Sequence, residues 1–232
     1  MESYYFITVP IGNFQDISYR AADALKNASI IICERPKATR ALLKFLNIDF
    51  YEGAARENEK STLLFPLTRK SSEHQIDYLK ELLMQNNSSA IAQVSDSGSP
   101  FFEDPGYRLL SFINKNARHI FRIGGTTSLS VFMMYFPERI KKFFFYGFLP
   151  RNTGEREKEL RGLLKMNLPL VFLETPYRTN KILKELKYLF SDWQILLGLD
   201  LTMESEKIIC TRLSQLKSTN LGKREFIALL YK

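Results

Sequence analysis

Residues 90–107 read AIAQVSDSGSPFFEDPGY, so that an apolar stretch passes directly into a loop of Ser, Asp, Gly and Pro. The stretch Ala90–Val94 is typical of a strand buried on both faces, and such strands occur mostly in parallel sheets. A helical pattern over Ser72–Asn86 precedes it, and a helix at Pro105–Asn114 is predicted to follow it. Strand and helix in alternation favour an α/β fold built on a mostly parallel sheet.

The same alternation extends through the first half of the chain. Further strands are predicted at Tyr4–Val9, Ser29–Cys33 and His119–Ile123, and further helices around residues 21–28 and 39–46. Residues 47–71 show no clear periodicity, which predicts an irregular segment there. We therefore predict a first α/β domain over residues 1–123.

The second half of the chain has a different order of elements. Strands are predicted at Phe143–Phe148, Leu168–Glu174, Trp193–Leu199, Lys207–Leu213 and Phe226–Tyr231, and helices at Gly154–Leu164 and Thr179–Phe190. The last strands follow one another without a helix, so a mixed sheet is predicted for a second α/β domain over residues 124–232. Trp193 and the Phe143–Phe145 run are expected to lie in its core.

Composition limits the class of protein. The 232 residues include two Cys and two His, which are not clustered, so no zinc site is expected. Cys33 and Cys210 each sit in an apolar run, which predicts two buried free thiols and a reducing cytoplasm. The longest apolar stretch, Phe143–Leu149, is far shorter than the ~20 residues of a membrane span, so no membrane partner is expected.

Basic residues are concentrated in the second half. Residues 1–117 carry 13 basic and 14 acidic residues, whereas residues 118–232 carry 20 and 11, a net charge of +9. This excess fits a polyanionic partner, and it equally fits an ordinary solvated surface rich in lysine. The basic residues that we expect to meet phosphates near the domain boundary are Arg139, Lys141, Lys142, Arg151, Arg156, Lys158 and Arg161.

Three loops follow predicted strands and are rich in Gly, Pro and Ser: Pro10–Asp16, Ser95–Tyr107 and Gly124–Ser128. Ligands of open α/β sheets bind beyond the carboxyl ends of the strands, and glycine lets the backbone approach a ligand closely. Ordinary turns share this composition. The dinucleotide fingerprint G-x-G-x-x-G, the P-loop and the G-x-S-x-G elbow are all missing, which argues against those three classes of enzyme.

The motifs resemble one known family in order along the chain. They are Pro10–Asn13 with Asp16, Ser95–Pro100 with Asp104–Leu109, Tyr146–Arg151 with Gly154–Arg156, and Glu174–Arg178. Together they are similar to the ribosomal RNA small subunit methyltransferase I family, within the tetrapyrrole methylases. The match runs from about Tyr4 to Tyr231.

The resemblance implies two α/β domains with S-adenosylmethionine in the cleft between them, and methyl transfer to the 2′-hydroxyl of a cytidine in small-subunit rRNA. It also implies a cytoplasmic homodimer that acts on rRNA or the ribosomal subunit. The residues expected to bind the cofactor are Pro10, Gly12, Asp96, Gly98, Ser99, Pro100, Thr127, Ser128 and Glu174. Glu34 and Asp16 follow strands and are the candidates for catalysis or acceptor orientation. Candidate RNA contacts are Arg40, Arg108, Arg151 and Lys158, although Arg108 has an equal alternative role in packing its loop.

The chain departs from the family pattern in four places: at Arg35–Lys37, at Ala54–Glu59, at Gly124–Ser128 and at Leu199–Asp200, of which Ala54–Glu59 lies outside the residues that the structure describes. These positions lie where an acceptor is expected, whereas the cofactor loops keep most of their motif. Two alternatives therefore remain open: a small-molecule methyltransferase of the tetrapyrrole type, and a non-catalytic relative that binds cofactor or RNA.

Overall fold

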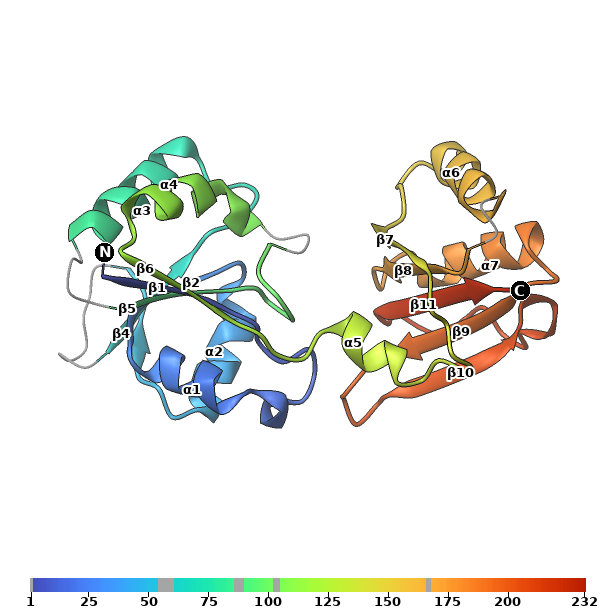
Figure 1. Ribbon diagram of the computed structural model, residues 1–232, viewed down its shortest axis with the longest axis horizontal. Coiled ribbons are helices and arrows are strands. Elements are labelled where there is room, and N and C mark those ends of the chain that lie inside the picture. The colour runs from blue at the N-terminus through green and yellow to red at the C-terminus, as the bar shows by residue number, and fades with distance from the viewer. Residues whose placement is uncertain (1, 54–60, 86–89, 102–104, 166–167) are drawn as a thin grey trace. The chain divides into compact units, whose positions relative to one another are not determined.

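The structure is a computed structural model that describes residues 2–53, 61–85, 90–101, 105–165 and 168–232 (Figure 1). The chain divides into two compact units, Met1–Thr127 and Ser128–Lys232. The first unit thus ends at Thr127, in the Gly-rich segment that follows the predicted boundary after Ile123.

The first unit is built on a parallel sheet of six strands in the order β3-β4-β2-β5-β1-β6. The strands are β1 (Ser3–Ile7), β2 (Ala28–Cys33), β3 (Phe50–Tyr51), β4 (Thr62–Pro66), β5 (Ala90–Val94) and β6 (His119–Ile123). The helices are α1 (Tyr19–Lys26), α2 (Pro36–Phe45), α3 (Glu73–Gln85) and α4 (Leu110–Asn116), with short 3₁₀ turns η1 (Phe14–Asp16) and η2 (Pro105–Leu109).

The prediction of an irregular segment at residues 47–71 was wrong, because β3 and β4 lie within it. β3 has two residues, too few for any periodicity, and β4 gains its partners from β2, where Ile30 to Cys33 pair with Leu63 to Pro66. The Thr62 hydroxyl also donates to the carbonyl of Ala28, at 2.8 Å. Pairing with a strand distant in sequence, not local pattern, creates this edge of the sheet.

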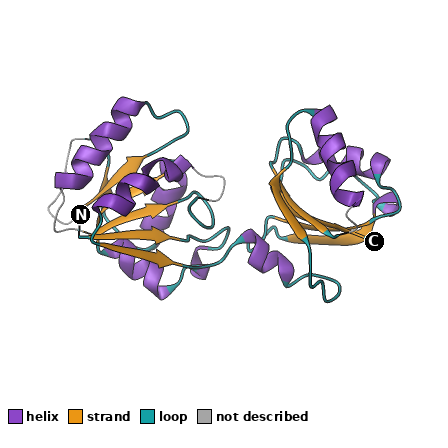
Figure 2. Ribbon diagram, turned by 45° about the horizontal axis from the view of Figure 1, so that its top comes forward, coloured by secondary structure: helices purple, strands orange, loops and turns teal. Residues whose placement is uncertain are grey.

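Two apolar layers cover the two faces of the first sheet (Figures 1 and 2). α1 and α2 pack Leu25 and Leu43 against one face, in a cluster with Ile31. α3 and α4 pack against the other face, in a cluster that contains Leu79 and Ile113. Because the central strands β1, β2 and β5 are covered on both sides, their apolar runs are nearly continuous, as the sequence of Ala90–Val94 predicted.

The second unit is built on a mixed sheet of five strands in the order β10-β9-β11-β8-β7. Its strands are β7 (Phe144–Phe148), β8 (Leu170–Glu174), β9 (Gln194–Leu199), β10 (Lys207–Arg212) and β11 (Phe226–Tyr231). Its helices are α5 (Ser128–Met133), α6 (Thr153–Lys165) and α7 (Thr179–Leu189), with a 3₁₀ turn η3 (Leu213–Gln215). β7 and β8 are parallel, while β11 is antiparallel to both β8 and β9, so the predicted fold class, with one parallel and one mixed sheet, is confirmed.

Two predictions about the core of the second unit were wrong. Phe144 is 39% exposed, because β7 is an edge strand and one of its faces is open to solvent. Cys210 is also exposed, since β10 forms the opposite edge, whereas Cys33 is buried as predicted. Trp193 packs against the core while remaining half-buried.

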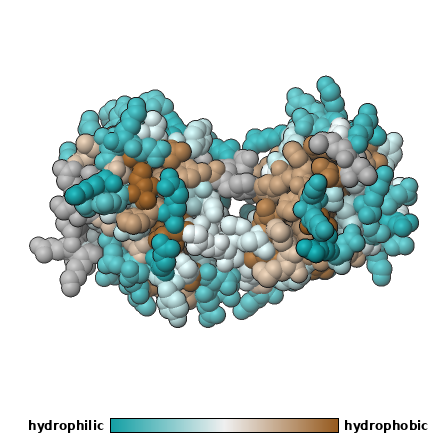
Figure 3. Space-filling model, viewed as in Figure 1, coloured by the Kyte–Doolittle hydropathy of each residue, from teal (hydrophilic) through white to brown (hydrophobic). Residues whose placement is uncertain are grey.

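The outer surface of the second unit is polar where its helices lie. Hydrophilic residues gather over α6 and α7 in the view of Figure 3. Among the helices of the described ranges, each is too short or too polar to cross a bilayer.

Candidate functional site

In the first sheet, the connections that follow the strands switch from one face to the other between β5 and β1. The segments after β1 and β2 lead to α1 and α2 on one face, whereas the segment after β5 leads to α4 on the other face. β5 and β1 are neighbours in the sheet, so the chain leaves these two carboxyl ends toward opposite faces. In open α/β sheets such a point is where ligands bind.

The loops after β1 and β5 are joined at this point. Val9 and Gly98 exchange two backbone hydrogen bonds, with N–O distances of 3.0 and 3.1 Å. The hydroxyls of Thr8 and Ser99 lie 3.0 Å apart, and the Ser95 hydroxyl donates to the carbonyl of Gly98 at 2.9 Å. Gly98 has a φ of +74°, a conformation that glycine adopts at little cost. Hydrogen bonds of Thr8 and Val9, which lead into the first predicted loop, therefore connect it to the second predicted loop at Gly98 and Ser99.

The loop after β6 reaches the same place. The Thr8 amide donates to the carbonyl of Ile123, at 2.9 Å. A Cβ added to Gly125 would lie 3.3 Å from atoms of Thr8, so a larger residue there would crowd this contact. Thr127 is the last residue of the first unit, and Ser128 begins α5 in the second unit.

The remaining predicted cofactor residues of these loops differ in how deeply they are buried. Pro10 is buried, while Gly12, Ser99 and Pro100 are half-buried. Residues 102–104 of the second loop lie outside the described ranges. The structure thus brings Pro10, Gly98 and Ser99 to one edge of the sheet, as the sequence predicted.

Asp96 is held by the loop after β2. Its carboxylate accepts a hydrogen bond from the Arg35 amide, at 2.8 Å, and pairs with the Arg35 Nε. Arg35 is one of the departures from the family pattern, and sequence analysis did not assign it a role. The pair links two neighbouring strand ends and neutralises the carboxylate within the loop after β5, while most of the Arg35 side chain stays exposed.

The two candidate catalytic carboxylates start from strands that are not neighbours. Glu34 is half-buried directly after β2, and Asp16 is exposed in the 3₁₀ turn that follows β1. β5 lies between β1 and β2, so their strand ends are roughly 10 Å apart at the usual strand spacing. Paired-carboxylate chemistry, in which two acids share one proton, needs a closer approach than this spacing favours.

Cys33 lies beside these groups and is not a nucleophile. Burial raises the pKa of its thiol from 9.0 to about 12, and the charge of Asp96 acts in the same direction. A thiol with this pKa stays protonated at neutral pH, and the thiolate is the reactive form.

A second group of motif residues meets in the second unit. Glu174 is fully buried at the end of β8, and its Oε1 accepts from the Thr175 amide and from Arg178 Nε, each at 2.7 Å. Arg178 also donates to the carbonyls of Leu149 and Pro150, at 2.9 and 3.1 Å. Glu174 Oε2 is buried without a partner among the described residues. Arg178, oriented by Glu174, therefore joins the loops after β7 and β8.

Arg156 was wrongly predicted to meet phosphates. Its side chain is 1% exposed and donates to both carboxylate oxygens of Glu185, at 2.6 to 2.8 Å. It also donates to the carbonyls of Pro150 and Arg151, at 2.7 and 2.9 Å. Arg156 and Arg178 thus bind the backbone of residues 149–152 from the inside, which leaves the Arg151 side chain exposed.

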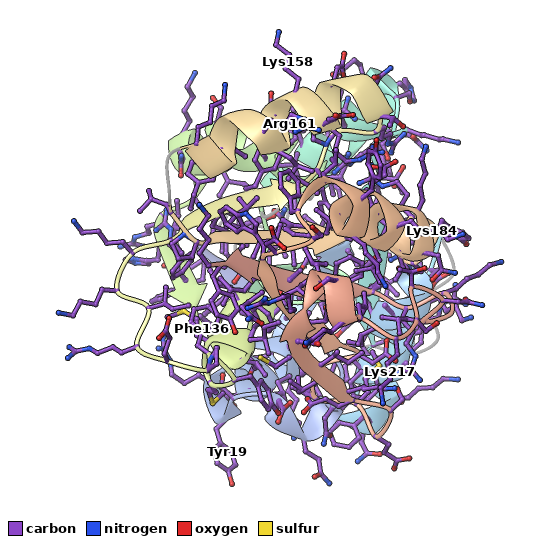
Figure 4. All side chains as sticks on the ribbon, turned by 90° about the vertical axis from the view of Figure 1, so that its right-hand side faces the viewer. Tyr19, Phe136, Lys158, Arg161, Lys184 and Lys217 are labelled. Atoms are coloured by element: carbon purple, nitrogen blue, oxygen red, sulfur yellow. The ribbon has the colours of Figure 1, made fainter. Side chains whose placement is uncertain are left out.

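The other candidate RNA contacts fall into two kinds. Lys158 projects from α6 into solvent (Figure 4). Arg40 forms an ion pair with Glu52 at 3.2 Å, and Arg108 donates to the Ser71 carbonyl at 2.7 Å and pairs with Glu73. These contacts favour the alternative role of Arg108, which is to pack its turn against the start of α3.

Comparison with known proteins identifies the chain. The family model of the Tetrapyrrole (Corrin/Porphyrin) Methylases matches residues 4–217. A protein named ribosomal RNA small subunit methyltransferase I from Borrelia garinii is 32% identical over 201 residues, which are 85% of this chain and 82% of that protein. Its namesake from Leptospira biflexa is 28% identical over 205 residues, 88% of this chain and 80% of that protein.

Solved structures show the same fold at low sequence identity. A diphthine synthase has a TM-score of 0.74 at 13% identity, with 100% of this chain and 90% of that chain covered. The uroporphyrin III C-methyltransferase of Thermus thermophilus has a TM-score of 0.65 at 16% identity, with 99% and 97% covered. The chain therefore belongs to the tetrapyrrole methylase family, among the relatives named ribosomal RNA small subunit methyltransferase I, and is a methyltransferase.

Proposed function

We propose that this methyltransferase uses S-adenosylmethionine to methylate the 2′-hydroxyl of a cytidine in small-subunit rRNA. The observation that carries the proposal is the similarity, over most of the chain, to relatives named for that rRNA. The three strand-end loops packed around Thr8 support it, because they place hydroxyls and backbone groups at the edge where an α/β sheet binds its ligand.

The residues at this edge fit the chemistry of the cofactor. S-adenosylmethionine carries hydroxyl, amino and carboxylate groups, which Ser99, Asp96 and backbone groups of the loops are suited to bind. Pro10, Gly12, Gly98 and Pro100 would set the shape of the loops, and Thr127, Ser128 and Glu174 are further proposed contacts. When bound, the cofactor supplies a methyl group on an already activated sulfonium.

The protein's part in the reaction is then to align the acceptor oxygen with that methyl group and to exclude water. A ribose hydroxyl is a weak nucleophile, so a carboxylate that accepts its proton would accelerate the transfer. We assign this role to Glu34, which is half-buried at the end of β2, and an orienting role to the exposed Asp16. Glu34→Gln should reduce kcat about 100-fold or more with little change in cofactor affinity.

Isothermal titration calorimetry with S-adenosylmethionine and S-adenosylhomocysteine tests the cofactor site. Gly98→Val should abolish binding, because a side chain would enter the loop that meets the ligand and would disfavour the φ of +74°. Gly53→Val is the matched control, since Gly53 has the same φ and no atom of the described residues lies within 4 Å of an added Cβ. Equal loss of heat in both variants, or no heat with the folded wild type, would contradict the site.

Mass spectrometry of rRNA nucleosides from a strain lacking this protein tests the acceptor. One 2′-O-methylcytidine should disappear, and it should return with the wild-type gene but not with Glu34→Gln. An unchanged nucleoside profile would reject rRNA and favour a small-molecule acceptor.

The resemblance also supports a cytoplasmic homodimer, which we include in the proposal. Sedimentation equilibrium of the full chain should give twice the 27.0 kDa mass of one chain.

A further inference from the structure

Tyr177 is displayed on a short turn between β8 and α7. Its ring is 84% exposed, although aromatic side chains usually bury most of their surface. The turn that carries it, Thr175–Arg178, follows the buried Glu174. The ring therefore adds almost nothing to the core of the second unit.

The turn beneath the ring is held in place on several sides. The Arg178 amide donates to the Thr175 carbonyl at 3.1 Å, and the Glu174 carboxylate binds both the Thr175 amide and the Arg178 side chain. The Thr179 hydroxyl lies 2.7 Å from the carbonyl of Arg224. A ring mounted on a fixed turn loses little conformational entropy when a ligand packs against it.

One basic side chain lies over the ring, and a second is exposed on the neighbouring loop. Lys223 Nζ is 5.6 Å from the centre of the Tyr177 ring. Arg151 is exposed on the neighbouring loop, whose carbonyls at Leu149 and Pro150 bind Arg178.

Acidic side chains at this edge are mostly neutralised. β11 pairs with both β8 and β9, and Phe226 lies opposite Glu174 and Leu199. Glu174, Asp200 and Glu225 therefore lie at the same end of these three neighbouring strands. Glu174 pairs with Arg178, and Asp200 pairs with Arg224 at 3.4 Å, which leaves Glu225 as an exposed acid. The exposed charges at this end of the second sheet therefore include Lys223 and Arg151 against Glu225.

We propose that Tyr177, with Lys223 and Arg151, forms a contact site for single-stranded RNA. An unpaired base stacks on the face of the Tyr177 ring opposite the one that Lys223 Nζ covers, and the adjacent phosphates lie against the two basic side chains. Stacking on an exposed aromatic residue inside a basic surface is how proteins commonly hold unpaired nucleotides, because every base has a π-face. The inference rests on the proposed function, in which the acceptor is RNA, and it assigns the residues that hold the strand.

Tyr188 provides a matched control within the same unit. Its ring is 86% exposed, and it lies near the end of α7, with Lys184 and Lys187 close to it in sequence. α7 has 11 residues, so Tyr188 lies about 16 Å along the helix from Tyr177, toward the opposite end of the sheet. The two tyrosines share exposure and basic neighbours, but only Tyr177 lies at the edge formed by the loops after β7 and β8.

Fluorescence anisotropy with a 5′-labelled 15-nucleotide oligoadenylate and the full-length protein tests the proposal. Tyr177→Ala should weaken binding about fivefold or more, as expected for the loss of one stacked base, without flattening the salt dependence. Tyr177→Phe and Tyr188→Ala should each bind within about twofold of the wild type. Lys223→Ala should weaken binding and lower the slope of log K against log salt by about 0.7.

Binding to heparin, a polyanion without bases, distinguishes the contribution of base stacking from that of charge. Tyr177→Ala should bind heparin as the wild type does, whereas Lys223→Ala should bind it more weakly. The proposal is overturned if the wild type does not bind the oligonucleotide at low salt, if Tyr177→Ala binds it normally, or if Tyr188→Ala has an equal effect. An equal loss of heparin binding in Tyr177→Ala overturns it as well.

Failure of this inference differs from failure of the proposed function. If Tyr177→Ala weakens oligonucleotide binding but the rRNA nucleosides do not change in the deletion strain, the RNA site stands and rRNA methylation fails. If the nucleosides change but Tyr177→Ala binds normally, only the Tyr177 site fails.

Discussion

At the scale of single residues, two largely buried arginines donate hydrogen bonds to the backbone carbonyls of neighbouring loops. Arg156 and Arg178 each pair with a glutamate and use further N–H groups to bind the carbonyls of Leu149, Pro150 or Arg151. Arginine suits this role because its guanidinium has five donors in a fixed plane and stays charged when buried. A lysine would place its three donors on one nitrogen and could not reproduce the two-oxygen pairing with Glu185 while also reaching the loop carbonyls.

Replacing Arg156 by Met should therefore lower the free energy of unfolding of the second unit by about 3–5 kcal/mol, because Glu185 loses its guanidinium partner and the Arg151 carbonyl loses the donor that the Arg156 side chain supplies. Urea unfolding followed by the fluorescence of Trp193, the one tryptophan of the chain, measures this loss. Arg161→Met on the same helix is the control: Arg161 pairs with Glu157 at the surface, so it should change little. An equal effect of both substitutions would contradict the argument.

The two cysteines should differ in reactivity. At pH 8, iodoacetamide should label the exposed Cys210 and leave Cys33 unmodified until the protein is denatured, as peptide mass spectrometry can show. The pKa of Cys33 is higher in the folded state than in the unfolded state, so its contribution to stability is complete below pH 9 and is lost as the pH rises toward 12. Between these values the free energy of unfolding should fall by up to about 1.4 kcal/mol per pH unit.

Urea unfolding followed by circular dichroism at pH 8, 9 and 10 measures that dependence, and Cys33→Ala should reduce it. Alkylation of native Cys33 at pH 8 would show that the thiol is less protected than the structure indicates.

At the scale of elements, glycines decide how closely a helix or loop approaches a strand. A Cβ added to Gly198 of β9 would lie 2.9 Å from Phe132 Cδ2, and 2.9 Å from Leu201 Cδ2. Phe132 belongs to α5 and is fully buried, so Gly198 allows α5 to pack on the second sheet. Gly98 acts differently: it has room for a Cβ, with Ile11 at 3.6 Å, and it is required for its positive φ.

Gly198→Val should consequently destabilise the second unit by about 1–3 kcal/mol, because Phe132 and Leu201 must move out of their packed positions. Gly162→Ala is the opposite case: within the described part of the chain, nothing lies within 4 Å of the added Cβ in α6, so the helix should gain up to about 1 kcal/mol. Trp193 fluorescence in urea compares the two variants. A Gly198→Val protein as stable as the wild type would mean that α5 does not pack tightly on β9.

At the scale of the whole molecule, the positive charge belongs to one unit. Ser128–Lys232 contains 18 basic and 11 acidic residues, whereas Met1–Thr127 contains 15 and 14. Arg156 and Arg178 are paired with the glutamates Glu185 and Glu174. The positive charge that a polyanion can reach therefore comes from exposed residues such as Arg151 and Lys158.

Arg151→Glu with Lys158→Glu should weaken the binding of small-subunit rRNA fragments and flatten its salt dependence, by about 0.7 in slope for each phosphate that the protein no longer neutralises. Cofactor affinity should stay nearly unchanged. Lys184→Glu with Lys217→Glu changes the net charge equally at two other exposed positions (Figure 4), and it should have a smaller effect. Equal flattening of the slope in both double variants would mean that net charge alone, not this surface, attracts the RNA.

Local pattern in the sequence determined the elements that are buried along their whole length and the loops between them. Runs such as Ala90–Val94 predicted strands of a parallel sheet, because burial on both faces requires continuous apolar residues. The composition of the loops after β1 and β5 predicted the candidate site, since Gly, Pro and Ser mark places where backbone meets a ligand. The order of the motifs predicted the family.

Only the tertiary structure decided which polar groups face each other. Arg35 and Asp96 are 61 residues apart and Arg156 and Glu185 are 29 apart, so no local pattern shows that they pair. In the sequence, Arg156 looks like its exposed neighbour Lys158, and Cys210 looks as buried as Cys33. The difference arises because burial of a charge or a thiol depends on what the neighbouring strands and helices place against it, and these neighbours come from distant parts of the chain.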